Sequence, residues 1–299
     1  MQYRWYNRFV TIYAALWVGS IFKKYLRKCA TFQGGRRLYI IENDGGNNSP
    51  HRQEGKFLAD NPEKKRVMIK VRNLRKEYRL DDDTVVALKR INLDIMQGEI
   101  CCIFGTSGSG KSTLLNQLAG LEKPTFGDVW IRGRAITRMN ENELAAFRQK
   151  HIGFVFQSYN LLPFMTATEN VAMPLMFRGE SKRQRTRKAV AILKKVGLAN
   201  RLKHYPRQMS GGQQQRVGIA RAFVAMPDVV FADEPTGNLD SKTTIEVMDM
   251  IKSFARRFNL TIVLVTHDPE LAQYADRIVT LVDGKIVKDT KGEQDEQAV

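Results

Sequence analysis

Cysteine and histidine are scarce in this chain of 299 residues, with three and four copies. The three cysteines are an odd number without metal-ligand spacing, so the sequence gives no basis for a disulfide framework or a structural zinc site. Cys101 and Cys102 are adjacent in an apolar run and are interpreted as small buried hydrophobes. This cysteine usage suits a reducing cytosol.

Long hydrophobic runs are missing as well. The uncharged run Phe9–Phe22 has fourteen residues. As a helix it is about 21 Å long, whereas a membrane-spanning helix needs about twenty residues. We therefore expect no membrane span. Internal repeats are also lacking, which predicts a single copy of the main domain.

Acidic residues are outnumbered, because 31 Asp/Glu stand against 48 Lys/Arg and give a net charge of +17. Residues 1–66 hold thirteen Lys/Arg and five Asp/Glu. Such an excess indicates nucleic acid or an anionic membrane surface as a neighbour. No RNA- or DNA-reading motif is present, so membrane proximity is favoured and no nucleic-acid partner is expected.

The run Gly105-Thr-Ser-Gly-Ser-Gly-Lys-Ser-Thr113 fits the phosphate-loop pattern G-x-x-x-x-G-K-[ST]. It lies between an apolar run that predicts a buried strand, Glu99–Phe104, and a predicted helix, Ser112–Ala119. In such a loop backbone N–H groups surround phosphates, Lys111 reaches the β- and γ-phosphates, and the Ser112 hydroxyl can ligate Mg²⁺. The alternative is a glycine turn with a surface lysine. The predicted nucleotide ligands are Gly105, Ser107, Gly108, Ser109, Gly110, Lys111, Ser112 and Thr113.

A second anion site is predicted at Met209-Ser-Gly-Gly-Gln-Gln-Gln-Arg216, where Ser-Gly-Gly opens a helix. One nucleotide does not need two such sites in one subunit, whereas two subunits facing head to tail would use both. The residues expected to meet the partner's nucleotide are Ser210, Gly211, Gly212 and Gln213.

Together the two motifs resemble the nucleotide-binding subunits of ATP-binding-cassette (ABC) transporters. The resemblance covers about Val67 to Lys288, and further elements follow in the family's order. These are the adenine-stacking Tyr78, the Q-loop Gln157 after Ile152–Phe156, the Walker B pair Asp233 and Glu234, the D-loop Gly237-Asn-Leu-Asp240, and the switch His267. Met209 stands where the family usually has leucine.

Chemistry gives reasons for these positions. Asp233 ends an apolar run and is predicted to hold Mg²⁺ with Ser112, and Glu234 is predicted to be the general base. The resemblance implies Gln157 as a further metal ligand, although glutamine after a strand is common on chemical grounds alone. His267 follows the predicted strand Leu260–Val265, so it emerges at the same sheet edge, where ligands of open α/β sheets bind. The alternatives are a solvated Asp-Glu turn, a structural histidine and, for Tyr78, an ordinary core aromatic. The predicted catalytic residues are Lys111, Gln157, Glu234 and His267.

The resemblance implies an α/β fold of the ABC type of P-loop NTPase, with a RecA-like core, an antiparallel β subdomain and an inserted helical subdomain. We expect the ATP-binding domain at 67–290, its helical subdomain at about 158–208, and a polar tail at 291–299. Apolar residues at helical spacing predict one packed helix face, made of Ala189, Ile192, Leu193 and Val196. The predicted antiparallel strands are Val67–Val71, Val85–Leu88 and Ile91–Ile95, and the predicted hairpin Ile278–Val287 turns at Asp283-Gly284.

The resemblance also implies an ATPase that uses ATP and Mg²⁺. It would pair with a second copy and drive a separate permease from the cytoplasmic face of the membrane. The tracts Phe156–Pro163, Ser210–Arg216 and Asp233–Ser241 look most like the lipoprotein-releasing, macrolide-exporting and cell-division-associated ATPases. A non-transport ATPase that gates an extracytoplasmic partner stays open, and a DNA-maintenance ATPase is a remote alternative.

Residues 1–66 have no counterpart in the usual family subunit, which begins near Met68. The run Phe9–Phe22 lies between basic residues, and no small-residue cleavage site follows it, which argues against a secretory signal. Glu42–Pro50 is polar and glycine-containing, as linkers are. Three interpretations remain: a helix at the interface of anionic lipid or permease, non-native sequence upstream of a start at Met68, or a disordered tail.

Overall fold

The computed structural model describes residues 66–80 and 83–291. The run Phe9–Phe22, the remainder of the extension through residue 65, and residues 292–299 of the predicted tail lie outside these ranges. No helix within the described residues is long and apolar enough to cross a membrane.

A six-stranded sheet forms the centre, in the order β10-β9-β3-β8-β7-β6. Five of these strands are parallel, and only β10 pairs antiparallel, with β9. β3, β7 and β8 are almost fully buried because helices and the second sheet cover both faces, which explains their continuous apolar runs. The strands are β3 (Ile100–Phe104), β6 (Ile152–Phe156), β7 (Val229–Asp233), β8 (Thr261–Thr266), β9 (Arg277–Val282) and β10 (Lys285–Lys291).

A four-stranded antiparallel sheet, in the order β2-β1-β4-β5, packs beside it. Its strands are β1 (Val67–Leu80), β2 (Asp83–Met96), β4 (Phe126–Ile131) and β5 (Arg134–Ala135). The antiparallel prediction is confirmed, but the strands predicted at Val85–Leu88 and Ile91–Ile95 are one strand, β2. Irregular register between Val71 and Glu77 bends β1 along this pairing.

The helices are α3 (Lys111–Leu118), α4 (Glu141–His151), α5 (Ala167–Phe177), α6 (Lys182–Lys195), α7 (Gly211–Phe223), α8 (Ser241–Phe258) and α9 (Pro269–Ala272). Short 3-10 turns occur at Ile136–Arg138, Ala199–Arg201 and Pro206–Gln208. Capping boxes begin three of the helices: Asn140 with Glu143, Thr166 with Glu169, and Ser210 with Gln213. Each box satisfies amide N–H groups that the first turn leaves free.

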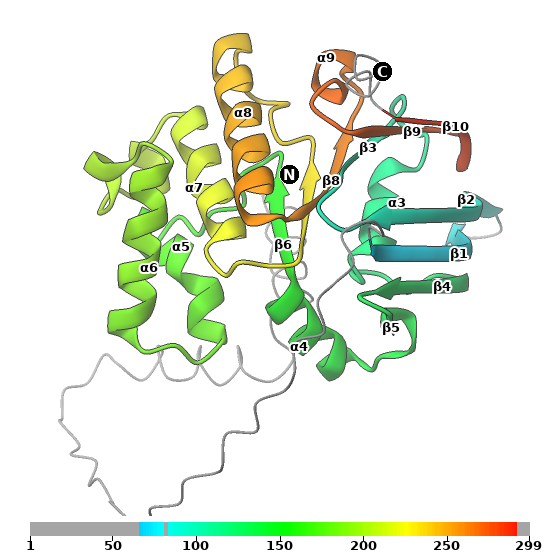
Figure 1. Cartoon of the computed structure of the whole chain (residues 1–299), viewed down its shortest axis with the longest axis horizontal. Coiled ribbons are helices and arrows are strands. Elements are labelled where there is room, and N and C mark those ends of the chain that lie inside the picture. The colour runs from blue at the N-terminus through cyan, green and yellow to red at the C-terminus, as the bar shows by residue number, and fades with distance from the viewer. Residues whose placement is uncertain (1–65, 81–82, 292–299) are drawn as a thin grey trace, which may run out of the picture.

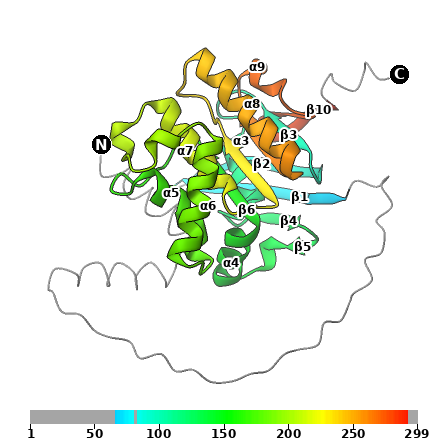
Figure 2. The ribbon, with the colours of Figure 1, turned by 60° about the vertical axis from the view of Figure 1, so that its left-hand side comes forward.

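The helices α5, α6 and α7 lie on one side of the central sheet and the antiparallel sheet on the other (Figure 1). In Figure 1 α6 lies at the outer side of the helical group, and turning the molecule brings it to the front (Figure 2). Because β3, β8 and β7 are parallel neighbours, the segments that follow them come together at one edge of the central sheet.

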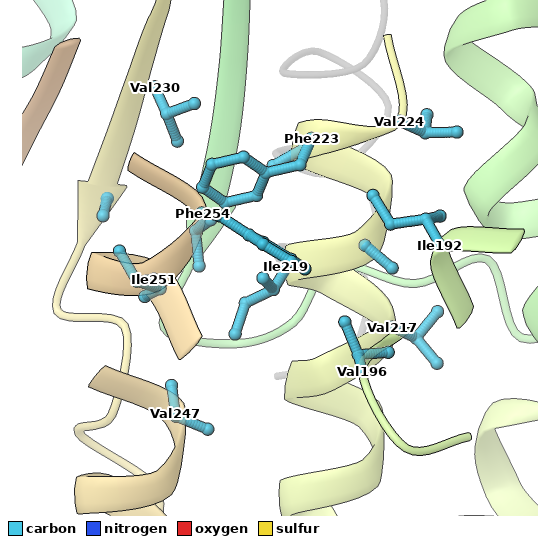
Figure 3. Close-up of a cluster of buried hydrophobic side chains, with 14 of the residues drawn as sticks. Ile192, Val196, Val217, Ile219, Phe223, Val224, Val230, Val247, Ile251 and Phe254 are labelled. Atoms are coloured by element: carbon cyan, nitrogen blue, oxygen red, sulfur yellow. The ribbon is translucent and has the colours of Figure 1, made fainter. Parts of the chain in front are cut away.

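One apolar core lies between α6, α7, α8 and the central sheet (Figure 3). The rings of Phe223 on α7 and Phe254 on α8 are 5.2 Å apart at its centre. Ile192 and Val196 reach this core from α6, with Ala189 and Leu193 also buried. The predicted packed face of α6 is confirmed.

Several predicted ends are shifted by one residue. β3 begins at Ile100 instead of Glu99, because the Glu99 carboxylate accepts a hydrogen bond from the Met96 N–H at the preceding turn. β8 begins at Thr261 instead of Leu260, whose N–H still bonds the Ala255 carbonyl at the end of α8. The Asp283-Gly284 turn is confirmed, since both residues have positive φ (48° and 72°) as a type I′ turn requires.

Candidate active site

The conformation of the loop between β3 and α3 depends on a glycine with positive φ, Gly110, and on the buried side chain of Lys111. Gly110 caps α3 with φ +102°, and a Cβ there would lie 2.7 Å from the Ala87 carbonyl oxygen. Another residue would be both strained and obstructed at this position. The Lys111 ammonium is buried and donates to the Thr106 carbonyl at 2.7 Å, which folds the loop over its own lysine.

The Ser109 hydroxyl is buried inside this loop and has no hydrogen-bond partner within the described residues. Its backbone is engaged, because its N–H bonds the Thr106 carbonyl and its carbonyl accepts from Gly284 N–H. A buried hydroxyl without a partner is rare.

A cavity of about 440 Å³ opens on the loop. Its lining joins the loop to strand β2, to the Asp283-Gly284 turn and to Glu234. The loop residues in the lining are Ser107, Gly108, Gly110, Lys111, Ser112 and Thr113. The cavity therefore lies where the predicted phosphate ligands converge.

Tyr78 lies next to this cavity on β1. Its partner across the β1–β2 pairing, Val85, lines the cavity. The hydroxyl donates to Glu122 at 2.7 Å, and the Lys76 ammonium lies 5.1 Å from the ring centre. Burial, and then the hydrogen bond to Glu122, raise the pKa of Tyr78 to about 12, so the hydroxyl remains a donor at neutral pH. Its stacking role remains a prediction.

Two adjacent carboxylates end β7. Burial first, and the neighbouring Glu234 second, raise the pKa of Asp233 to about 6, against the opposing effects of Lys111 and a hydrogen bond from Ser112. Asp233 thus lies within reach of both loop residues. Glu234 has φ +42° and donates its N–H to the Val265 carbonyl at 2.9 Å, which turns its side chain out of the sheet plane.

His267 follows β8 and contacts Glu234, with 2.7 Å between His267 Nδ1 and Glu234 Oε1. The ring is exposed, whereas Glu234 is largely covered. A second cavity of about 640 Å³ begins at these two residues and continues along Gly237, Leu239 and Tyr274. Glu234 lines both cavities, so it stands at their junction.

Gln157 directly follows β6, whose last residue Phe156 pairs with Asp233. The Gln157 side-chain nitrogen packs against Gly237. A Cβ added at Gly237 would lie 2.7 Å from that nitrogen. The Gln157 carbonyl accepts from the Asn238 side chain at 3.0 Å. Gln157 is therefore held against the loop that follows Glu234.

The predicted second anion site does not join these cavities within one subunit. The residues from Ser210 to Gln213 appear in the lining of neither one. Ser210 is exposed at the start of α7 and its hydroxyl accepts from Gln213 N–H at 3.3 Å. Asp240 caps α8, where hydrogen bonds from Thr243 lower its pKa.

The residues at the loop suit a magnesium ion that also binds a nucleotide. Among the described residues no three His, Cys, Asp or Glu side chains gather as a metal-only cluster. Mg²⁺ bound with nucleotides takes one or two protein carboxylates, with phosphate oxygens and water completing its shell. Ser112 and Asp233, which lie close enough for the Ser112 hydroxyl to lower the pKa of Asp233, provide such a partial donor set.

Two further residues of α7 hold this site together and were missed from the sequence. Gln215 is fully buried and its side-chain nitrogen donates to the Pro235 carbonyl, next to Glu234. Arg221 donates to the carbonyls of Tyr159 and Asn160, just after Gln157. Helical spacing could have identified Gln215, which is four residues before the buried Ile219 on the same face.

The ABC transporter family matches residues 88–237. An uncharacterized ABC transporter ATP-binding protein of Methanocaldococcus jannaschii, MJ1508, is 50% identical over 74% of this chain and 98% of its own length. The chain belongs to the ABC transporter family. It is an ATP-binding ATPase of that family, as the resemblance implied.

Other relatives place the chain within the family. The uncharacterized ABC transporter ATP-binding protein YknY of Bacillus subtilis is 46% identical over 76% of the chain and 98% of its own length. The macrolide export ATP-binding/permease protein MacB of Pasteurella multocida is 46% identical over 75% of the chain. The chain spans about a third of that relative's length, 34%.

Solved structures agree with the fold. A dimeric, post-hydrolysis structure of the ATP-binding cassette MJ0796 with ADP and Pi has a TM-score of 0.71 and 42% identity, covering 75% of this chain and 98% of that one. The predicted ABC ATPase fold is confirmed. The individual roles of the site residues remain predictions.

Proposed function

We propose that this chain is the ATP-hydrolysing subunit of a transporter, and that two copies close head to tail around two ATP molecules. The observation that carries the proposal is the division of the site. Lys111, Asp233, Glu234 and His267 gather at one sheet edge, whereas Ser210 to Gln213 stand apart at the exposed start of α7. The dimeric MJ0796 relative supports a second subunit as the partner that joins the two halves.

In this arrangement the loop amides, Lys111 and Ser112 bind the phosphates, and Tyr78 faces the adenine. Ser112 and Asp233 hold Mg²⁺, with Gln157 beside them, and the bound ion neutralises phosphate charge. The Glu234 carboxylate takes a proton from the attacking water. His267 holds that carboxylate through its 2.7 Å contact and reaches toward the γ-phosphate.

The partner subunit's helix start completes the site only when a γ-phosphate is present, since a helix N-terminus and its amides attract anions. ATP would therefore hold the dimer closed, and hydrolysis would open it. Gln157, held against the loop after Glu234, would pass this closure to the segment from Tyr159 onward and so to the helices α5 and α6.

The work of the dimer is to drive a membrane permease carried by a separate chain, from the cytoplasmic face of the membrane. The match to MacB, which is named for macrolide export and contains a permease, favours export or a mechanical transmission of motion over import. Lipoprotein release is the neighbouring possibility. Gating of an extracytoplasmic partner, as in cell division, is the alternative, and identifying the permease that co-purifies from membranes would separate these.

Glu234→Gln tests the central proposal. The variant should bind ATP but hydrolyse it about 10²–10⁴-fold more slowly, the usual contribution of a general base. Because the γ-phosphate persists, ATP should also trap the variant as a dimer, which size-exclusion chromatography measures.

The matched control is Glu270→Gln, because Glu270 lines the same large cavity without touching the phosphate loop. It should hydrolyse ATP within about threefold of the wild-type rate, far from the loss expected for a general base. If Glu234→Gln also stayed within that range, Glu234 would not be the base.

A further inference from the structure

The positive charge of the ATPase domain is concentrated in one segment. Residues 178–207 hold eleven Lys/Arg and one Asp/Glu, Glu180. The other residues from 67 to 299 hold twenty-four Lys/Arg and twenty-five Asp/Glu, so they are close to neutral. After Glu180 the next acidic residue is Asp228. The net charge of the domain therefore sits on α6 and the turns that follow it.

Helix α6 presents these charges outward. Its apolar side packs into the core, while the helix itself lies at the outer side of the helical group (Figure 1). Arg183, Arg187 and Lys194 are exposed and follow one another at spacings of four and seven residues, which places them in one row along the helix. The row is about 17 Å long at 1.5 Å per residue. We call these three residues the basic row.

Within residues 66–80 and 83–291, no acidic side chain pairs with the basic row. In the part of the chain that the structure describes, the one ion pair of α6 joins Lys188 to Glu180 at 2.7 Å. Arg185 is used differently, since it donates to the Glu180 carbonyl. The charges of the basic row thus face outward without an acidic partner among the residues that the structure describes.

This arrangement opposes the stability of the helix itself. Lys182 and Arg183 occupy the first turn, which has no acidic residue, at the end of a helix where the dipole favours negative charge. Arg183 and Arg187 are like charges four residues apart, which also destabilises a helix. Stability alone would favour glutamate at these positions, so an anionic partner outside the subunit accounts better for the basic residues.

We propose that the basic row binds the headgroups of anionic lipids at the membrane surface. The charges lie on a convex helix and in a row, which fits an extended anionic surface. The helix carries no aromatic side chain that could stack on nucleic-acid bases, since Lys182–Lys195 contains none. Anionic leaflets attract such clusters within about a Debye length, roughly 8 Å in physiological salt.

This surface lies apart from both cavities and has no part in ATP hydrolysis, so the inference goes beyond the proposed function. It would orient the helical side of the ATPase toward the lipid and add to whatever contact a permease provides. Each lysine or arginine near an anionic membrane contributes about fivefold in binding.

The test compares two variants of the full chain that change the net charge equally. The first is Arg183→Glu with Arg187→Glu and Lys194→Glu. The control is Lys123→Glu with Lys285→Glu and Lys288→Glu, three exposed lysines outside α6. Co-sedimentation is measured with phosphatidylcholine vesicles that contain or lack phosphatidylglycerol, without permease, at low and physiological salt.

The wild type should bind only the vesicles with phosphatidylglycerol, and salt should weaken the binding. The α6 variant should bind these vesicles on the order of 100-fold more weakly, whereas the control should change by less than about fivefold. Glutamate at position 183 suits the first turn of a helix, so circular dichroism should show the α6 variant folded.

If both variants bound the vesicles equally weakly, net charge alone would explain the loss of binding, and the proposal would be overturned. Unchanged binding by the α6 variant would also overturn it, because lipid binding would then be assigned to residues outside α6. A third overturning result is loss of binding to duplex DNA or RNA by the α6 variant with vesicle binding intact, because the basic row would then serve nucleic acid.

Discussion

Asp233 is a carboxylate that the fold places at an energetic disadvantage. Burial and the neighbouring Glu234 raise its pKa to about 6 from an ordinary value of 3.8, despite Lys111 and Ser112 nearby. Between these two values the folded protein keeps a proton that the unfolded chain has already lost. Its contribution to folding stability therefore falls as the pH rises through this window. Such a loss of stability at a residue proposed to hold a cation is typical of ligand-binding residues.

Asp233→Asn should therefore stabilise the nucleotide-free protein at neutral pH. The shift corresponds to about 3 kcal/mol at full ionisation. The gain should be largest above pH 7, shrink as the pH falls below about 6, and vanish well below pH 3.8, where Asp233 is neutral in both states. Urea unfolding of the wild type and the variant over this range measures the free-energy difference.

Asp240→Asn is the matched control, because it makes the same chemical change at a carboxylate whose pKa is lowered by Thr243. Asp240→Asn should change the free energy of unfolding in the opposite direction, so this variant should be less stable than the wild type at neutral pH. A gain from Asp233→Asn that is as large in acid as at neutral pH would show that burial of charge is not its cause.

At the scale of elements, the segment after Gln157 is held in an unusual backbone conformation. Tyr159 and Asn160 both have left-handed φ, at 59° and 47°. Two consecutive non-glycine residues in this region store strain that neighbouring contacts must offset. Arg221 of α7 provides such contacts by donating to both carbonyls. The last turn of α7 and the segment after Gln157 are thereby coupled.

Arg221→Ala should destabilise the protein by about 2–4 kcal/mol, because it removes a charged donor from the partly buried carbonyls of Tyr159 and Asn160. Arg216→Ala is the matched control on the same helix. Arg216 forms a more exposed pair with Glu246, worth at most about 1 kcal/mol. It donates one further hydrogen bond, to the Val196 carbonyl at 3.2 Å, so its loss should cost about 1–2 kcal/mol in total. Chemical denaturation measures both, and equal losses would contradict the special role of Arg221.

Local patterns predicted the elements that rest on neighbouring residues. The strand β3, the turn at Asp283-Gly284 and the packed face of α6 follow from apolar runs, turn residues and helical spacing. The single long strand β2 and the bends of β1 did not, since they depend on pairing with residues far along the chain. The motifs showed which residues belong to the site and in which order they occur along the chain. The positive φ of Glu234, its contact with His267 and the support from Gln215 arise only when distant strands meet.

At the scale of the whole molecule, one subunit contains two halves of different sites. The phosphate loop and Glu234 lie at one edge, and the start of α7 at Ser210 lines neither cavity. A head-to-tail dimer would join the phosphate loop of each subunit to Ser210 of the other. Each ATP would then depend on one loop and on the opposite subunit's helix.

This geometry predicts how two inactive variants behave together. Ser210→Arg should bind ATP as a monomer but not hydrolyse it, and Lys111→Ala should lose the phosphate contact. In a heterodimer one site carries both changes and the other carries neither, so hydrolysis should return in part. The heterodimer can be purified through two different affinity tags and its ATPase rate compared with that of each homodimer.

Ser181→Arg provides the control for the lost helix cap. Ser181 caps α6 as Ser210 caps α7, each accepting from the N–H three residues on, at 3.4 and 3.3 Å. Losing either cap costs about 1 kcal/mol, but only Ser210 would face a nucleotide across the dimer. Ser181→Arg should therefore keep its ATPase activity. If purified heterodimers of Ser210→Arg and Lys111→Ala stay inactive while Ser181→Arg is active, the two halves do not meet head to tail.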